Sequence, residues 1–456
     1  MSSTFRAIPS VDAVLGELRS NGSWPHALAV EAARTAIERA REAVKEGAEA
    51  PDVATISAEA EAILEELARP SLRRVVNATG VILQTNLGRA PLSERAMAAM
   101  AEAARDYTNL EFDVAEGSRG SRHEHVRDLL RRTTGADDGL AVNNNAAALL
   151  MALHVFARGR EVIVSRGEAV EIGGRFRIPD VLRESGAELV EVGTTNRTYA
   201  EDYANAITDE TAAILRVHRS NFQVTGFTAR PELGDLAALA REHGVLLLDD
   251  LGSGCLIETG DYGVEHEPTV RESLDGGADL TLFSGDKLLG GPQCGLIVGQ
   301  GERVATLRRH PLARALRVDK LTIAALNATL MAYVGGTERE EIPVWRMLAL
   351  EREQLEPRAR AWAEAGEGRV VESRSMIGGG AAPGAGRTTW CAALQGTQGG
   401  EGLARLLREA DPPIVARVES GETLLDPRTV AESDDKHVTA TIQALLRAQS
   451  SGGTHS

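Results

Sequence analysis

The sequence has 456 residues, which is too long for one compact core, so we expect two or three domains. Its apolar fraction of 43% and charged fraction of 25% are ordinary for a globular protein, and no apolar run approaches the roughly 18 residues that span a bilayer. The formal net charge of −16 argues against indiscriminate nucleic-acid binding, so an RNA partner must meet a local basic patch. Residues 1–9 contain no hydrophobic signal region, and we therefore expect a cytoplasmic protein outside membranes.

Residues 1–70 are predicted to form a helical N-terminal domain. Apolar residues recur at helical spacing from about residue 10 to residue 68, where Pro70 ends the pattern. Acidic residues outnumber basic ones here, so charge alone does not indicate RNA binding.

Residues 71–336 are predicted to form an α/β catalytic core. Short apolar runs alternate with helical stretches and predict strands at 140–143, 161–165, 188–193, 212–217, 245–249, 280–283 and 295–298. Strands this apolar indicate a mostly parallel sheet covered by helices on both faces. Catalytic groups are then expected at the carboxyl ends of the strands.

Residues 337–449 are predicted to form a small α+β C-terminal domain. A long helix pattern runs through Trp345, Leu348 and Leu350, and a Gly-rich stretch follows at 378–386. Residues 414–425 are interpreted as two strands joined at 420–422, and the polar tail 450–456 is expected to be disordered.

Metal and disulfide chemistry are not expected. Cys255, Cys294 and Cys391 are widely separated, and neither they nor the ten histidines show metal-ligand spacing. The cysteines are interpreted as buried, and His218 and His123 as turn or edge residues rather than ligands.

Three local patterns, in chain order, fit a cofactor with a phosphate, a pyridine ring and an aldehyde. In the first, Asn144, Asn145 and Ala146 stand where a strand ends and a helix begins, and the free backbone N–H groups of such a helix start can bind a phosphate. A simply capped helix is the alternative.

The second pattern places Asp250, in Asp-Asp-Leu-Gly-Ser-Gly, directly after an apolar strand. A carboxylate there can pair with a protonated pyridine nitrogen and keep the ring an electron sink, although an acidic cap is the alternative. We prefer Asp250 to Asp249 because it heads the Gly-rich turn.

The third pattern is Ser-Gly-Asp-Lys-Leu-Leu-Gly-Gly at 284–291, where Lys287 can form a Schiff base with the aldehyde and then act as a free base. Asp286 is grouped with Lys287 and Asp250 as catalytic. Lysines in turns are usually solvated, but the three patterns together indicate pyridoxal 5′-phosphate.

Several longer motifs resemble one family along nearly the whole chain. They are Asn77-Ala-Thr-Gly80, Thr85-Asn-Leu-Gly-Arg89, residues 142–148, Ser165-Arg-Gly-Glu168, Glu171-Ile-Gly-Gly174, residues 176–179, Gly193-Thr-Thr-Asn-Arg-Thr198 and the Lys287 segment. The sequence resembles bacterial L-seryl-tRNA(Sec) selenium transferase, the selenocysteine synthase family.

The resemblance implies a fold-type I pyridoxal-phosphate transferase, aspartate-aminotransferase-like in its large domain. Such an enzyme converts seryl-tRNA(Sec) to selenocysteinyl-tRNA(Sec) with selenophosphate through a cofactor-bound dehydroalanyl intermediate. The resemblance also implies a tRNA-binding N-terminal domain and a homodecamer built as a pentamer of dimers.

Selenophosphate is an anion, and forked arginine donors suit it. By resemblance, Arg89, Arg314 and Arg317 bind it, with Arg314 and Arg317 expected on one helix face. Arg119 is expected either to reach the site of a neighbouring subunit or to be a structural turn residue.

Three further positions are less defined by the sequence. Ser284 is expected to add a hydroxyl to the cofactor phosphate, and Asn221 to approach the ring oxygen, with helix or strand capping as the alternative for both. Arg428 occupies the region where many fold-type I enzymes hold a substrate carboxylate, but a serine esterified to tRNA has none, so a structural role is favoured.

Two other functions stay open at this point. One is a pyridoxal-phosphate lyase or transferase acting on a free amino acid or amino sugar with the same Lys287 and Asp250. The other is a tRNA-binding scaffold with a relic cofactor site. The helical N-terminal domain and the Arg314/Arg317 pair disfavour the first, and the intact cofactor residues disfavour the second.

Overall fold

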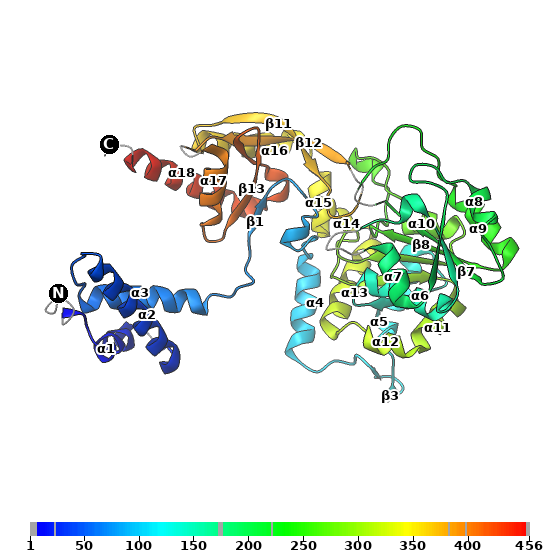
Figure 1. Cartoon of the computed structure of the whole chain (residues 1–456), viewed down its shortest axis with the longest axis horizontal. Coiled ribbons are helices and arrows are strands. Elements are labelled where there is room, and N and C mark those ends of the chain that lie inside the picture. The colour runs from blue at the N-terminus through cyan, green and yellow to red at the C-terminus, as the bar shows by residue number, and fades with distance from the viewer. Residues whose placement is uncertain are drawn as a thin grey trace. The chain divides into compact units, whose positions relative to one another are not determined.

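The computed structural model describes residues 7–21, 24–171, 177–219, 222–381, 384–396 and 399–452. The chain divides into two compact units, residues 1–74 and 75–456 (Figure 1). Within the described ranges, no helix is both long and apolar enough to span a membrane.

The first unit is a three-helix module with its own core. It contains α1 (Val11–Asn21), α2 (His26–Lys45) and α3 (Val53–Ala68), as the hydrophobic periodicity predicts. Asp52 caps α3 by accepting a hydrogen bond of 2.8 Å from the backbone N–H of Thr55. Buried aliphatic residues from all three helices, such as Val14, Ala33 and Ile56, close the core.

The second unit is built on a seven-stranded sheet with the order β4-β10-β9-β8-β7-β5-β6. Neighbouring strands pair in parallel except at β10, which is antiparallel to both β4 and β9, so the expected mostly parallel sheet is confirmed. The strands are β4 (Asp138–Val142), β5 (Glu161–Ser165), β6 (Glu188–Val192), β7 (Thr211–Val217), β8 (Leu246–Gly252), β9 (Leu280–Ser284) and β10 (Gly295–Gly299).

Helices cover both faces of this sheet because successive strand residues point to opposite sides. Leu140 and Val142 join the core under α6 (Asn145–Ala157), α7 (Ile178–Ser185), α11 (Gly301–Arg309) and α12 (Pro311–Ala315). Ala141 faces the core formed with α5 (Glu124–Thr134) and α13 (Lys320–Gly335). The same side carries α8 (Ala200–Ala204), α9 (Leu233–His243) and α10 (Val270–Asp275), while α4 (Glu94–Arg105) packs on α13.

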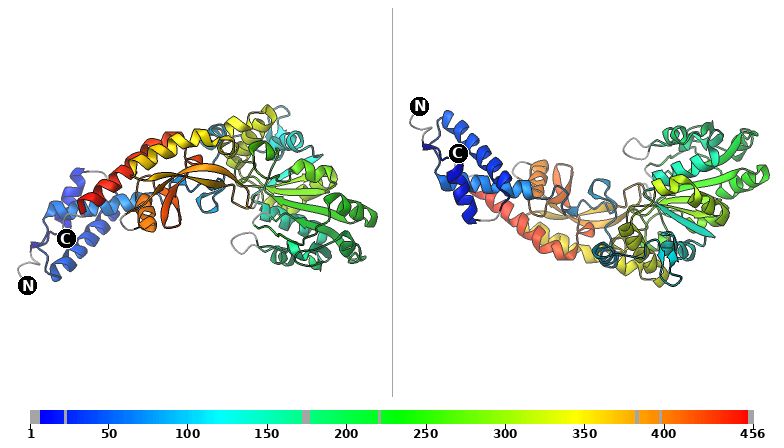
Figure 2. Two further views of the ribbon diagram at one scale, coloured as in Figure 1. Left: turned by 90° about the horizontal axis from the view of Figure 1, so that it is seen from above. Right: turned by 90° about the horizontal axis from the view of Figure 1, so that it is seen from below.

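A five-stranded sheet with the order β1-β13-β14-β12-β11 forms the smaller part of this unit. Its strands are β1 (Val76–Ala78), β11 (Arg369–Met376), β12 (Gly386–Leu394), β13 (Ile414–Glu419) and β14 (Glu422–Leu425). Helices α16 (Arg352–Ala365) and α18 (Asp435–Gly452) run side by side along it (Figure 2). Trp362 of α16 is buried in the core formed with this sheet. Helix α17 (Gly399–Arg408) packs on β13 and β14.

The structure differs from the sequence predictions in three places. Strand β1 falls in the segment assigned to the catalytic core, yet it pairs in parallel with β13 of the small sheet, because its apolar side chains are buried there. The long helix expected near Trp345 is broken into α14 (Glu338–Glu341), α15 (Pro343–Ala349) and α16, since Pro343 lacks the N–H that would continue a helix. Helix α18 extends to Gly452, inside the tail expected to be disordered.

Candidate active site

Asp250 and Lys287 approach one another at the carboxyl edge of the large sheet. Asp250 lies near the end of β8, and Lys287 follows the neighbouring strand β9 by three residues. Both are buried, with 2% and 5% exposure. A Cβ atom on Gly252 would lie 3.5 Å from Lys287 Nζ and 4.0 Å from Asp250 Oδ1, so the glycine leaves the space between them open.

Burial shifts the pKa values of both groups. It raises the pKa of Asp250 to about 6, against the opposing effects of the Asn145 hydrogen bond and the Lys287 charge. Burial also lowers the pKa of Lys287, and Arg89 adds to this while Asp250 opposes it. Asp249 faces away and accepts a 2.6 Å hydrogen bond from Ser273, which supports the choice of Asp250 as the residue facing Lys287.

The start of α6 lies beside this pair. Asn144 is the N-cap and accepts a hydrogen bond of 2.8 Å from the backbone N–H of Ala147, while Asn145 Nδ2 donates to Asp250 Oδ1 at 2.8 Å. A side chain on Gly295 would come within 2.1 Å of the Asn144 carbonyl, so this loop can lie against β10 only because residue 295 is glycine. Asn145 therefore bridges the helix start and the buried carboxylate.

Arg89 contacts Asp286, the residue before Lys287. Its Nη1 donates to Asp286 Oδ2 at 2.8 Å, and Ala90 N–H donates to the Asp286 carbonyl at 3.2 Å. Arg89 adopts a left-handed backbone conformation with φ of 62°, which is strained for a residue with a side chain. The Arg89 side chain is one-third exposed, and its guanidinium is paired with Asp286.

A glycine loop from the small sheet reaches the lysine. Lys287 Nζ donates a 3.3 Å hydrogen bond to the carbonyl of Gly380. Gly378, Gly379 and Gly380 all have positive φ, and a Cβ on Gly379 would come within 2.5 Å of the Leu83 carbonyl. The loop therefore depends on glycine for its close approach to Leu83, and the sequence shows the composition of the loop without predicting the contact with Lys287.

His218, which sequence reasoning missed as a site residue, lies next to Asp250 and contacts the buried acid Glu267. The backbone N–H of His218, the residue after β7, donates to the Asp250 carbonyl at 2.9 Å. The ring Nε2 of His218 lies 3.1 Å from Oε1 of Glu267, and Glu267 is 2% exposed. The signal in the sequence is the position of His218 directly after a predicted strand, although such a position is also typical of a turn or edge residue.

Several arginines line a cavity of about 320 Å³. Its lining contains Glu111, Arg119, Arg122, His123, Arg308, Arg309, His310, Arg314 and Arg317. Burial and neighbouring arginines lower the pKa of His123 to about 4, and so keep it neutral. The structure therefore brings three of the four predicted anion-binding arginines together here, but separates them from Arg89, which binds Asp286.

The expectation that Arg314 and Arg317 share a helix face is wrong. Helix α12 ends at Ala315, and Leu316 leaves the helical conformation. Arg317 instead forms an antiparallel bridge with Val142, because the Leu316 carbonyl accepts a hydrogen bond from Asn143 N–H at 3.0 Å. Arg119 lies on the exposed hairpin of β2 (Phe112–Asp113) and β3 (Ser118–Arg119), 3.2 Å from Glu111.

Arg428 is enclosed by the small sheet and α15. It is 1% exposed and donates from Nε to Ser375 Oγ and from Nη2 to the Thr388 carbonyl, both at 2.9 Å. Nη1 donates to the carbonyls of Met347 and Leu350. The guanidinium is therefore already paired within the protein, which favours a structural role over binding of a substrate carboxylate.

The remaining predicted residues have simpler placements. Ser284 ends β9 and is 7% exposed, whereas Asn221 and residues 172–176 lie outside the described residues. The three cysteines are buried and free. His266 lies between Glu258 and Glu272 in an exposed cluster, where both of its ring nitrogens already meet carboxylates at 3.0 and 3.2 Å.

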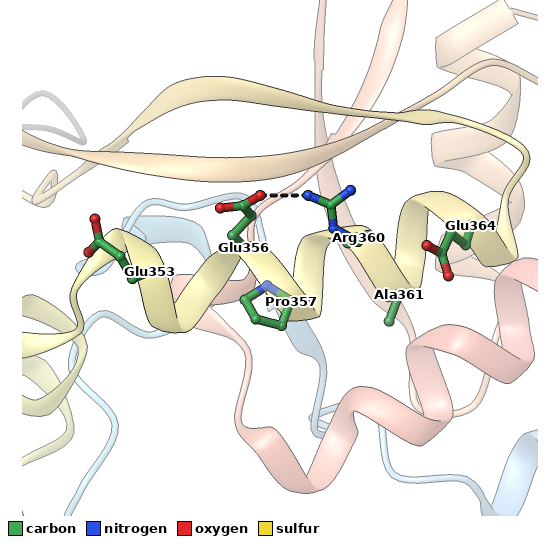
Figure 3. Close-up of a pocket in the computed structure, with 6 residues that line it drawn as sticks. All are labelled: Glu353, Glu356, Pro357, Arg360, Ala361 and Glu364. Carbon is green, nitrogen blue, oxygen red and sulfur yellow. Dashed lines mark hydrogen bonds and ion pairs between the residues drawn. The ribbon is translucent and has the colours of Figure 1, made fainter.

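Another hollow lies on the outer face of α16 (Figure 3). The lining of the hollow includes Glu353, Glu356 and Glu364. Among the lining residues, Arg360 alone is positively charged, and it is paired with Glu356 at 2.6 Å. Its net negative charge makes it unsuited to ligands that carry a phosphate group.

The residues around Lys287 fit a ring that carries an aldehyde, a phosphate and a basic nitrogen. Asn145 Oδ1 is buried without a hydrogen-bond partner in the described part of the chain, and Gly252 keeps space free beside the lysine amine. The N-terminus of α6 presents unpaired backbone N–H groups close to Asp250.

Comparison with known proteins agrees with this geometry. Residues 75–431 match the family model described as L-seryl-tRNA selenium transferase. A protein named L-seryl-tRNA(Sec) selenium transferase from Solidesulfovibrio magneticus is 45% identical, over 97% of this chain and 98% of the relative. A Moorella thermoacetica protein of the same name is 44% identical, over 98% of each. Among solved structures, D-glucosaminate-6-phosphate ammonia-lyase matches 85% of this chain and 99% of its own, with 22% identity and a TM-score of 0.61, which shows a shared fold.

The fold and this site define a pyridoxal-phosphate-dependent enzyme of fold type I. The class follows from the doubly covered sheet, the buried lysine after β9 and the carboxylate on β8. The chain belongs to the L-seryl-tRNA selenium transferase family.

The raised pKa of Asp250 predicts a pH-dependent stability difference. The folded pKa of about 6 exceeds the ordinary value of 3.8, so the stability that this group provides at low pH is lost as the pH rises from the lower value to the higher. Asp250→Asn removes this loss. In urea titrations of cofactor-free protein, the variant should therefore gain on the order of 2–3 kcal/mol relative to wild type between pH 4 and pH 7. Exposed Asp128→Asn is the control, and a difference independent of pH would contradict the expected titration.

Proposed function

We propose that the protein converts L-seryl-tRNA(Sec) to L-selenocysteinyl-tRNA(Sec) with selenophosphate, for selenoprotein biosynthesis in the cytoplasm. Membership of the family supports the reaction, since relatives with this printed name align over nearly the whole chain. The observation that carries the chemistry is the buried Lys287 beside Asp250 at the carboxyl edge of the sheet.

The roles proposed for the site residues follow from their positions. Bound pyridoxal phosphate supplies an electron sink for the electrons released at the serine α-carbon. The α6 N-terminus, with Asn144, Ala146 and Ser284, binds its phosphate. Asp250, oriented by Asn145, holds the proton on the ring nitrogen, and Asn221 is proposed to approach the ring oxygen.

Lys287 is proposed as the base that takes the serine α-proton. Its lowered pKa increases the fraction of uncharged amine near neutral pH. Asp286, fixed by Arg89, positions the lysine segment from the next residue. Burial excludes water while the β-hydroxyl leaves and selenium takes its place.

The enclosed Arg428 favours an esterified serine over a free amino acid. A free amino acid brings a carboxylate that needs a charged partner when it is bound away from water. Arg428 already donates four hydrogen bonds within the protein, so it offers no such partner. A serine joined to RNA has no free carboxylate.

Positive charge for selenophosphate is proposed to come from Arg89, Arg314 and Arg317, with Arg119 acting at the site of a neighbouring subunit. The cavity lined by both Arg314 and Arg317 supports an anion site at that pair. Arg89 is the member nearest Lys287, through Asp286.

We also propose that residues 1–70 contact the tRNA and that the protein is a decamer, a pentamer of dimers. The N-terminal helices form a separate compact unit, which the relatives' alignments include. Between α4 and β3, Tyr107, Phe112 and Val114 are exposed, with Tyr107 fully so, and an apolar surface of this kind is typical of a contact with another subunit. The mass of the purified protein in solution tests the assembly: a monomer would contradict it.

A single-turnover assay tests the reaction. Wild-type protein with pyridoxal phosphate, seryl-tRNA(Sec) and selenophosphate should release selenocysteine from the tRNA after mild alkaline hydrolysis. Lys287→Ala should lack both this product and the visible absorbance of the lysine-bound cofactor. If the cofactor absorbance is normal but the serine on the tRNA is unchanged, the assignment of the cofactor site stands and the proposed substrate is excluded. Turnover by Lys287→Ala would exclude its assigned role.

Arg314→Ala should raise the selenophosphate concentration needed for half-maximal rate about tenfold or more, because a charge-assisted hydrogen bond to the anion is lost. Its cofactor absorbance should not change. Arg183→Ala, which removes an exposed arginine paired with Asp180 on α7, is the matched control. Equal selenophosphate dependence of the two variants would rule out Arg314 as an anion ligand.

A further inference from the structure

The motif Gly193-Thr-Thr-Asn-Arg-Thr198 has no role in the chemistry described above, although its loop is firmly held. It follows β6 and pairs with the loop that follows β7. Thr198 N–H donates to the Ala229 carbonyl at 3.1 Å, and Ala229 N–H donates to the Asn196 carbonyl at 3.0 Å. The motif and residues 226–230 therefore form a fixed pair of loops.

Phe227 projects from this pair of loops into solvent. Its ring belongs to a residue that is 84% exposed, yet its carbonyl is held by Asn196 Nδ2 at 2.6 Å and Arg197 Nε at 3.3 Å. The Arg197 guanidinium carbon lies 5.7 Å from the ring centroid, a cation–π geometry that occupies one side of the ring only. Tyr199 and Phe222, on the same two loops, are also exposed. Folding gains little from an aromatic surface left in water.

These loops are at the edge of the sheet that carries Lys287. Both follow the carboxyl ends of parallel strands. At the usual strand spacing, β7 is two strands from β9, roughly 10 Å, and β6, at the edge of the sheet, is four strands from it, roughly 19 Å. Gln223, between Phe227 and β7, reaches the glycine loop, since a Cβ on Gly384 would lie 3.3 Å from its Oε1. Arg166, half exposed beside the motif, donates to the Gly193 carbonyl, and its charge is partly offset by Glu191 at 3.7 Å.

We propose that Phe227 and Arg197 form a stacking platform for an unpaired base at the 3′ end of the aminoacylated RNA. The inference rests on the proposed tRNA substrate. Exposed aromatic rings and planar guanidinium groups are the surfaces on which unpaired bases stack, and they accept any base. The location also fits, because the serine reaches Lys287 while attached to this end of the RNA. In a protein of net charge −16, Arg197 supplies local positive charge for an RNA end at this position.

The platform can be tested by combining RNA truncation with substitution. Probes are unacylated tRNA(Sec), intact or lacking its four 3′-terminal nucleotides, and the readout is the equilibrium binding constant. For the wild-type holoenzyme, truncation should weaken binding about 5- to 150-fold, the range expected for loss of a stacked base. Phe227→Ala should bind intact tRNA more weakly by a similar factor, and truncation should then have little further effect. Phe227→Tyr should restore the difference.

Matched variants separate stacking from charge. Arg197→Lys retains the charge but loses the planar group, so it should fall between wild type and Arg197→Ala. Arg183→Ala, another exposed arginine of the same unit, should bind both RNAs as wild type does. Intact tRNA carrying 2-aminopurine at its 3′-terminal position should lose fluorescence on binding wild type, and lose less on binding Phe227→Ala.

Each result distinguishes the platform from the broader proposal. Failure of wild type to bind tRNA would overturn both. Tight binding with an equal truncation penalty in wild type and Phe227→Ala, or no penalty in wild type, would overturn the platform alone. A changed mass of Phe227→Ala in solution would overturn it by identifying Phe227 as a contact between copies of this chain.

Discussion

The site depends on placing a carboxylate and an amine together where water is excluded. Each charge is costly to bury alone, and each lowers the cost of the other. Burial raises the pKa of Asp250 and lowers the pKa of Lys287, so the uncharged form of each group is more favoured than it would be on the surface. Asn145, Arg89 and Asp286 surround the pair with further hydrogen bonds and charge. This balance makes the site receptive to a ring that binds to both groups.

The sheet places Asp250 and Lys287 close together. Strands β8 and β9 are parallel neighbours, so their carboxyl ends lie at the same edge of the sheet. Glycines permit the approach of everything else. Gly252 keeps the space beside the lysine open, Gly295 lets the Asn144 loop lie against β10, and Gly379 brings the small sheet within reach. The arrangement of the site therefore depends on these glycines as well as on its charged side chains.

Much of this was predictable from sequence, because strands buried on both faces are continuous apolar runs and every predicted strand of the large sheet is present. The order of polar turns after those strands also indicated Lys287 and Asp250. Contacts across long sequence separations were not predictable: His218 with Glu267, Lys287 with Gly380, and Arg317 outside its expected helix depend on tertiary geometry. The membership of β1 in the small sheet is of the same kind, since its three residues fit either sheet.

The position of β1 also affects the order in which the protein can be completed during synthesis. Val76 pairs with Ile414, so at 5–20 residues per second β1 waits about 20 to 70 s on the ribosome before its partner strand is made. Until then its backbone groups have no strand beside them on that sheet. The large sheet, whose strands lie between these two segments, can be assembled first. The Gly380 carbonyl lies between β11 and β12 of the small sheet, so it can reach Lys287 only after the strands that carry Asp250 and Lys287 have been made.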